Sequence, residues 1–145
     1  MPSTTSSTSL VPAATYPAIV GRVLADFREN QSEKMSQADL AEAAGLKQAA
    51  WSKIERGQTA LNVEQLAQVA KTLGVQPWEI VRAADDVAKH AAKKGVKVEP
   101  TRIDPMAAGA VLISAAALGA LVGVGLATWR ARRAQDPQDA SDSEG

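Results

Sequence analysis

The chain has 145 residues, and its 16 lysines and arginines balance 16 aspartates and glutamates, so the formal net charge at pH 7 is zero. It contains no cysteine and one histidine, which excludes disulfides and thiolate metal sites and argues against imidazole zinc sites and serine–histidine catalysis. We therefore expect one small domain with appended segments, no metal, no cofactor and no enzymatic activity.

The first segment, residues 1–16, is uncharged and rich in serine, threonine, alanine and proline. Its apolar surface is too small to offset the entropy that the chain would lose on ordering, so we expect a disordered arm. The segment also lacks the basic start and the apolar run of a secretory signal.

Five helices joined by short loops are predicted for residues 17–94. Apolar residues recur every three or four positions, which indicates helices with one buried face. Ser36 and Asn62 are typical N-caps, each followed three residues later by a side chain that can complete a capping box. The predicted helices span residues 17–30, 37–44, 47–56, 62–73 and 77–94. The sequence predicts no convincing strand, so the expected fold class is all-α.

The second and third predicted helices are separated by a tight turn at Gly45, which is the arrangement of a helix-turn-helix. The stretch SQADLAEAAGLKQAAWSKIERG (36–57), followed by LNVEQLAQVAKTLGV (61–75), resembles the Xre-type, lambda-repressor-like helix-turn-helix family. The resemblance implies a five-helix domain that binds double-stranded DNA as a dimer. In such a domain the first helix of the motif braces against the phosphate backbone and the second enters the major groove.

The resemblance also implies a set of DNA-binding residues. Gln37 resembles the glutamine that contacts a phosphate and braces the recognition helix. Gln48 resembles the glutamine at the head of that helix, whose amide can bond to adenine. Lys47, Ser52 and Lys53 lie near the same exposed side, and we expect them to reach base edges or phosphates.

Three further residues are expected to act structurally. In this family the glutamate at the position of Glu55 commonly pairs with an arginine on the first helix, for which Arg28 is the candidate. Trp51 lies in line with Ile54 and is expected in the core rather than against bases. The sequence departs from the family at Lys47, where a serine or threonine usually caps the recognition helix.

Residues 106–129 form an apolar stretch of 24 residues without a charge, long enough to span a bilayer. Trp129 ends it, and Arg130, Arg132 and Arg133 follow, as expected at a membrane interface. The sequence therefore predicts a transmembrane helix, with residues 95–105 as its linker and residues 130–145 as a basic, then acidic, disordered tail. The alternative is a buried helix of a soluble oligomer.

Four small residues with a spacing of four lie on one face of the predicted membrane helix: Ala115, Gly119, Gly123 and Ala127. Such a face lets two backbones approach closely, so we expect self-association in the lipid bilayer. The five positive charges between residues 89 and 102 favour an orientation with the N-terminal domain in the cytoplasm.

These observations predict a membrane-anchored regulator of transcription, a repressor of the Xre type from a bacterium, plasmid or phage, in the inner (cytoplasmic) membrane. Two alternatives remain open. One is a membrane-tethered adaptor of the RodZ type, whose helix-turn-helix binds a protein partner. The other is a soluble antitoxin-like regulator whose apolar tail binds a partner.

Overall fold

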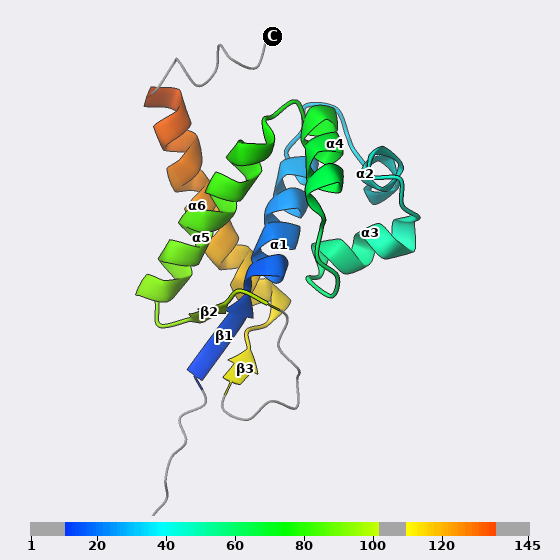
Figure 1. Cartoon of the computed structure of the whole chain (residues 1–145). Helices are drawn as coiled ribbons and strands as arrows, with labels where there is room; N and C mark the ends of the chain where they lie inside the picture. Colours follow the sequence, from blue (N-terminus) through cyan, green and yellow to red (C-terminus); the bar gives the residue numbers. More distant parts are fainter. Residues whose placement is uncertain (1–10, 102–109, 136–145) are drawn as a thin grey trace, which may run out of the picture.

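Helices dominate the part of the chain that the computed structural model describes, residues 11–101 and 110–135 (Figure 1). In chain order its elements are β1 (Val11–Thr15), α1 (Tyr16–Glu29), α2 (Gln37–Ala43), α3 (Gln48–Glu55), α4 (Val63–Leu73), α5 (Pro77–Lys93), β2 (Lys97–Glu99), β3 (Ala110–Leu112) and α6 (Ala115–Gln135). The first five helices lie where the sequence predicts them, to within a residue at each end. The prediction of a mostly helical fold is therefore confirmed.

Side-chain caps explain where the helices begin. Ser36 accepts a hydrogen bond from the Asp39 N–H at 3.1 Å, and the Asp39 carboxylate accepts one from the Ser36 N–H at 2.7 Å. Asn62 and Gln65 make the same reciprocal pair of bonds at the start of α4. Gly74 ends that helix with a φ of 72°, a left-handed conformation that costs free energy for any residue with a Cβ. Both capping boxes predicted from the sequence are present.

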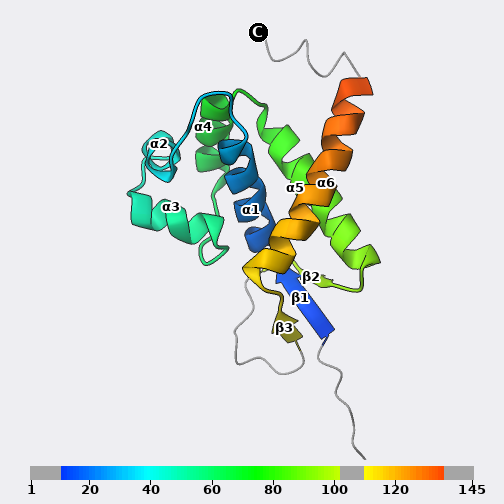
Figure 2. The ribbon, with the colours of Figure 1, turned by 180° about the vertical axis from the view of Figure 1, so that it is seen from behind.

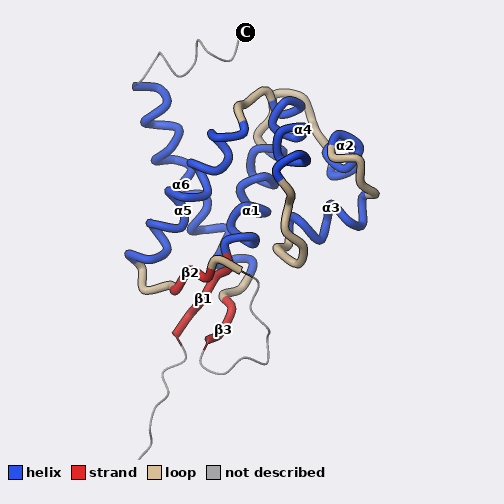
Figure 3. The backbone as a smooth tube through the Cα atoms, in the orientation of Figure 1, coloured by secondary structure: helices blue, strands red, loops and turns tan. Residues whose placement is uncertain are grey.

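Helix α1 runs through the middle of the molecule, with α2, α3 and α4 on one side and α5 and α6 on the other (Figure 3). One apolar core joins both sides. Its largest fully buried apolar side chains are Trp51, Ile19, Leu24, Leu40, Ile80 and Leu126. At Gly21 helix α1 comes so close to α3 that a Cβ would collide with the carbonyl of Ile54. This contact fixes the position of α3 against the core.

The all-α prediction needs a correction at the base of α1, where three short strands form a parallel sheet in the order β2-β1-β3 (Figure 3). Residues 11–15 were expected in the disordered arm 1–16, and residues 97–99 in the linker 95–105. Instead Ala13 pairs with Lys97 on one side and with Leu112 on the other. Because these partners are distant along the chain, no local pattern in the sequence indicates the pairing.

The predicted transmembrane helix is wrong. Within residues 11–101 and 110–135, no helix is long and apolar enough to cross a membrane. The apolar stretch 106–129 is divided between β3 and α6, and α6 continues to Gln135 beyond the end of that stretch. Residues 106–109 lie outside the described residues. The predicted location in the membrane, the bilayer as a partner and the membrane-tethered adaptor all depended on that helix and are corrected with it.

Helix α6 packs on α5 and α1 instead (Figure 2). Its buried side chains recur every three or four residues: Leu118, Val122, Leu126 and Trp129. The Trp129 ring meets that of Phe27 edge-on at 5.2 Å between centroids. The three arginines that resembled a membrane flank form ion pairs with the domain, in the pairs Arg130–Asp26 (2.8 Å), Arg132–Asp86 (3.1 Å) and Arg133–Glu79 (3.3 Å).

The small residues predicted to pack in a bilayer have other surroundings. Ala115, Gly123 and Ala127 are exposed, and Gly119 is half-buried beside Arg22. The close contact in α6 is made by a different glycine: a Cβ on Gly125 would lie 2.9 Å from the Cα of Val87 on α5. The prediction of their packing in a lipid bilayer required a transmembrane helix, and no described helix is long and apolar enough to be one.

Candidate nucleic-acid interface

Helices α2 and α3 are joined by a turn of four residues that contains Gly45. This glycine has a φ of 70°, a left-handed conformation that residues with a Cβ rarely adopt. The Leu46 N–H then donates to the Ala41 carbonyl at 2.8 Å and closes the turn. The turn lets α3 leave α2 at an angle, with both helices still packed against the core (Figure 1).

Helix α3 has one buried and one exposed side. Trp51 and Ile54 are buried in the core, with exposures of 0% and 2%. On the other side Lys47, Gln48 and Lys53 are exposed, and Ser52 is half-buried. Four of the predicted DNA-binding residues therefore belong to one short helix and its N-cap. Ammonium and amide groups on such a surface can bind phosphates and the edges of bases.

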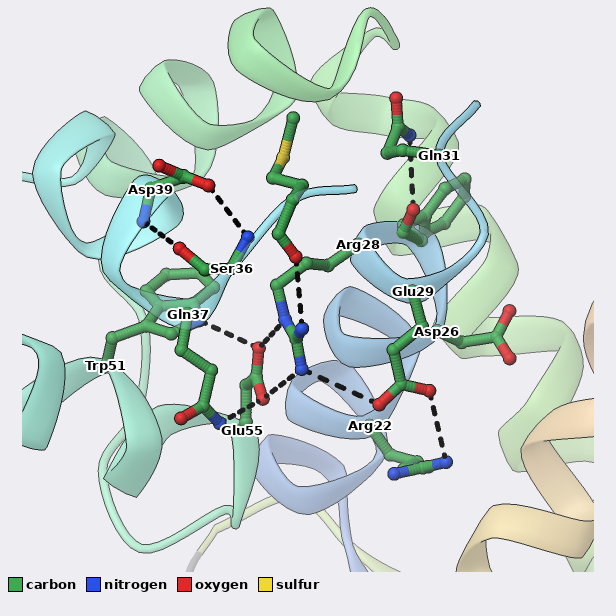
Figure 4. A network of polar contacts seen from close by, with 12 residues as sticks. Arg22, Asp26, Arg28, Glu29, Gln31, Ser36, Gln37, Asp39, Trp51 and Glu55 are labelled. Carbon is green, nitrogen blue, oxygen red and sulfur yellow. Dashed lines mark hydrogen bonds and ion pairs between the residues drawn. The ribbon is translucent and has the colours of Figure 1, made fainter. Parts of the chain in front are cut away.

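The carboxylate of Glu55, in the last turn of α3, accepts hydrogen bonds from three side chains (Figure 4). Arg28 donates from Nε to Oε1 at 2.8 Å and from Nη2 to Oε2 at 3.2 Å. Gln37 donates to Oε2 at 2.7 Å, and the Trp51 indole donates to Oε1 at 2.8 Å. Both Arg28 and Glu55 are mostly buried, with side-chain exposures of 14% and 6%. This network ties α1, α2 and α3 together.

The network also shifts the protonation equilibria of its charged members. Burial raises the pKa of Glu55, but the hydrogen bonds from Arg28, Gln37 and Trp51 outweigh it and hold the pKa below its ordinary value. The hydrogen bond to Glu55 raises the pKa of Arg28 further, against the opposing effect of its own burial. Both groups are thus charged at neutral pH, which keeps α3 fixed to α1.

Sequence reasoning paired Arg28 with Glu55 but missed the other contacts of this network. The resemblance implied that Gln37 contacts a phosphate and braces the second helix of the motif, and in the structure its NH₂ group bonds to Glu55 of that helix. Sequence reasoning also missed the carbonyl of Met35, which accepts from Arg28 Nη1 at 3.2 Å. The spacing of these residues along the chain carries no signal for these bonds.

Lys47 occupies the N-cap position of α3, and its side chain makes no capping hydrogen bond. This fits the departure from the family seen in the sequence, since a serine or threonine there would bond to a free N–H of the first turn. The residue instead contributes an exposed ammonium at the start of the helix. Within the described part of the chain, no group of three or more histidine, aspartate or glutamate side chains could hold a metal ion.

Comparison with known proteins supports this assignment of the motif. Residues 24–79 match the family model described as helix-turn-helix. The chain is also similar to the crystal structure of the clp gene regulator ClgR from Corynebacterium glutamicum, with 27% identity and a TM-score of 0.51 over 57% of this chain and 87% of that one. No curated protein matches the sequence. The Xre-type helix-turn-helix domain predicted from the sequence is thus found at residues 24–79.

Proposed function

We propose that this protein is a sequence-specific DNA-binding regulator of transcription that reads its site with α3. The exposed polar side of α3, held on a rigid frame by the Glu55 network, is the observation that carries the proposal. The similarity to the clp gene regulator ClgR supports the same class of function.

Each exposed side chain of α3 has a role in this proposal. The amide of Gln48 bonds bidentately to adenine N6 and N7, and the ammonium of Lys53 donates to guanine O6 or N7. Lys47 and Ser52 contact phosphates or neighbouring base edges. Gln37 orients the recognition helix through the bond from its NH₂ group to Glu55, and the second N–H of that group donates to a phosphate. Each good base contact contributes about 1–3 kcal/mol of discrimination.

The balance of charge predicts binding that depends on sequence more than on electrostatics. The formal net charge of the chain is zero, and Glu55 on α3 is neutralised by Arg28. We therefore expect the complex to contain few phosphate contacts. Because such contacts supply most of the non-specific affinity for DNA, that affinity should be weak at physiological salt. Binding as a dimer to a palindromic operator, with half-sites about 34 Å apart, would double the contacts and raise specificity.

The experiment is to select binding sites for the purified full-length chain from a pool of random DNA duplexes and then measure affinities by fluorescence anisotropy. The test variant is Gln48→Ala with Lys53→Ala. The control is Gln68→Ala with Lys71→Ala, which removes the same two residue types from the exposed surface of α4. We expect the test variant to lose at least about tenfold in affinity for the selected site.

Circular dichroism establishes that both variants keep the helical content of the parent chain. An enriched, symmetrical sequence that the control binds and the test variant does not would support α3 as the reader. Failure to enrich any sequence, or equal loss in the two variants, would refute the proposal and favour a helix-turn-helix that binds a protein.

A further inference from the structure

A cavity of about 1090 Å³ lies behind the recognition helix, between the helix-turn-helix domain and the C-terminal segment. One wall comes from α1 and the end of α3, and the other from β1, β3 and the first turn of α6. Its volume is at the upper end of the range for pockets that bind small molecules, about 300–1,000 Å³. The cavity is therefore large enough to hold a ligand of that size.

The charged lining of the cavity favours an anion. Three arginines and two glutamates line it, so one positive charge is left over. Glu55 is neutralised by Arg28, whose Nε, Nη1 and Nη2 all donate to Glu55 or to a backbone carbonyl. Arg56 is exposed at the mouth. Of the two remaining arginines, Arg22 is the less exposed.

The guanidinium of Arg22 has fewer acceptors than donors. Its Nε is buried without a hydrogen-bond partner within the described residues, and its Nη2 lies 3.9 Å from the nearest Glu29 oxygen (Figure 4). That separation is at the outer limit of an ion pair, and Glu29 also lies 3.5 Å from Arg28. A buried polar group without a partner is rare in folded proteins, and a bound ion or ligand is one of its explanations. The Arg22 side chain is 39% exposed, so its outer nitrogens are accessible to a ligand.

The part of the lining that the C-terminal segment contributes is apolar. Leu112 ends β3, Ile113 follows it, Leu118 lies near the start of α6, and small alanines of α1 complete the wall. Leu112 is 46% exposed, a large apolar side chain with little cover from the chain itself. The cavity thus combines an apolar area with the guanidinium of Arg22, which lies beside Gly119 of α6 and has too few acceptors. This combination matches a molecule with one acidic group and an apolar body.

We propose that this cavity binds a small amphipathic anion, with its acidic group on Arg22 and its apolar body against Leu112, Ile113 and Leu118. The regulatory consequence rests on the proposed DNA-binding function. The cavity is also lined by Gln37, Ser52 and Glu55, which belong to the frame and the surface of the recognition helix. A ligand there contacts the residues that hold α3, so its binding and DNA binding are coupled reciprocally.

The binding experiment needs no DNA and uses the purified full chain. The probe is 1-anilinonaphthalene-8-sulfonate, an aromatic sulfonate that fluoresces in apolar sites, and its neutral counterpart N-phenyl-1-naphthylamine lacks the sulfonate. We expect the anionic probe to bind once per chain and at least tenfold more tightly than the neutral one. Arg22→Gln should weaken the anionic probe at least tenfold. Arg82→Gln, which removes an exposed arginine on α5 outside the cavity, should leave its affinity unchanged.

A second pair of variants tests the location without changing charge. Ala115→Trp adds bulk at the cavity wall, whereas Ala116→Trp adds it at the next exposed position of α6, which does not line the cavity. Only the first should reduce probe binding. The proposal is overturned if the anionic probe does not bind, if it binds Arg22→Gln as tightly as the parent chain, or if the two probes bind equally. It is also overturned if both tryptophan variants behave alike.

Coupling is measured last, as the affinity for the selected DNA site with and without saturating anionic probe. A shift in the parent chain that disappears in Arg22→Gln supports regulation through this cavity. If the probe binds but the affinity for DNA does not change, the proposed coupling to DNA binding is overturned, whereas the proposed ligand site in the cavity stands. Because the first two experiments contain no DNA, a failure of the DNA-binding proposal is distinguishable from a failure of the cavity.

Discussion

Arg28 and Glu55 join α1 to the last turn of α3, with Nε of Arg28 2.8 Å from Oε1 of Glu55. Both side chains are largely buried, so the pair is shielded from water and from salt. Two more donors, from Gln37 and Trp51, satisfy the remaining capacity of the carboxylate. The orientation of α3 therefore depends on a single buried carboxylate.

Removing the arginine should cost substantial stability. In Arg28→Met the Glu55 charge stays buried and keeps only its bonds from Gln37 and Trp51, so we expect a loss of about 3 kcal/mol in the free energy of unfolding. Urea denaturation of the full chain measures it. Arg82→Met, at an exposed position on α5, should change stability by less than about 0.5 kcal/mol. Equal, small losses in both variants would show that the pair adds little.

The lowered pKa of Glu55 makes stability depend on pH in a known direction. In the unfolded chain this carboxylate takes up its proton near the ordinary pKa of 4.5, whereas the folded chain keeps it ionised to lower pH. The stabilisation from Glu55 is therefore complete above about pH 4.5 and is lost as the pH falls from there through the folded pKa.

A comparison with Glu55→Gln isolates this contribution, because the amide does not titrate. We expect the parent chain to lose more stability than Glu55→Gln when urea denaturation is repeated at pH 7 and at pH 3.5. Asp39, whose pKa is also lowered, by hydrogen bonds from Ser36, is present in both proteins and cancels in the difference. Identical pH profiles for the two proteins would contradict the lowered pKa of Glu55.

Replacing Lys47 by serine should have opposite effects on stability and on DNA binding. Lys47→Ser supplies the missing N-cap of α3 and should raise the free energy of unfolding by about 0.5–1 kcal/mol. It also removes an exposed ammonium, so DNA affinity should fall and the slope of log K against log salt should become shallower by about one. Lys71→Ser, in the last turn of α4, removes a charge without adding a cap and should show neither gain in stability nor change in the slope. An unchanged slope for Lys47→Ser would remove Lys47 from the phosphate contacts.

The helix-turn-helix domain could be predicted from the sequence because its signals are local. Ser36 with Asp39 and Asn62 with Gln65 are three residues apart, so a reader of the sequence sees both halves of each cap. Gly45 likewise indicates the turn by its residue type alone. The family resemblance added the partnership of Glu55 with an arginine on α1, which spacing by itself does not indicate.

The C-terminal segment could not be predicted in the same way. Hydropathy reports that a segment avoids water, and it does not distinguish a lipid environment from a protein surface. The decisive partners of α6 are distant: Arg130 pairs with Asp26, 104 residues earlier in the chain. The sheet could not be predicted for the same reason, because β1 pairs with strands more than eighty residues away. The structure of α6 and of the sheet thus depends on contacts with residues far away along the chain, and a local sequence pattern carries no information about such contacts.

Two glycines of α6 test this packing directly. A Cβ on Gly125 would lie 2.5 Å from Cγ2 and 2.9 Å from Cα of Val87, so α6 and α5 would have to move apart. A Cβ on Gly123 would have no neighbour within 4 Å. We expect Gly125→Ala to lower the free energy of unfolding by about 1–3 kcal/mol through overpacking. Gly123→Ala should raise it by about 0.5–1 kcal/mol, because alanine loses less backbone freedom in a helix than glycine.

Urea denaturation of the two variants, followed by the fluorescence of Trp129 and the other tryptophans, makes the comparison. The substitutions are chemically identical and two residues apart on the same helix, so any general effect of alanine on α6 is shared. A difference of opposite sign can arise only if one face of α6 is in contact with Val87. If the two variants changed stability equally, α6 would not be packed on α5 in solution, and the cavity between this segment and the recognition helix would lose one of its walls.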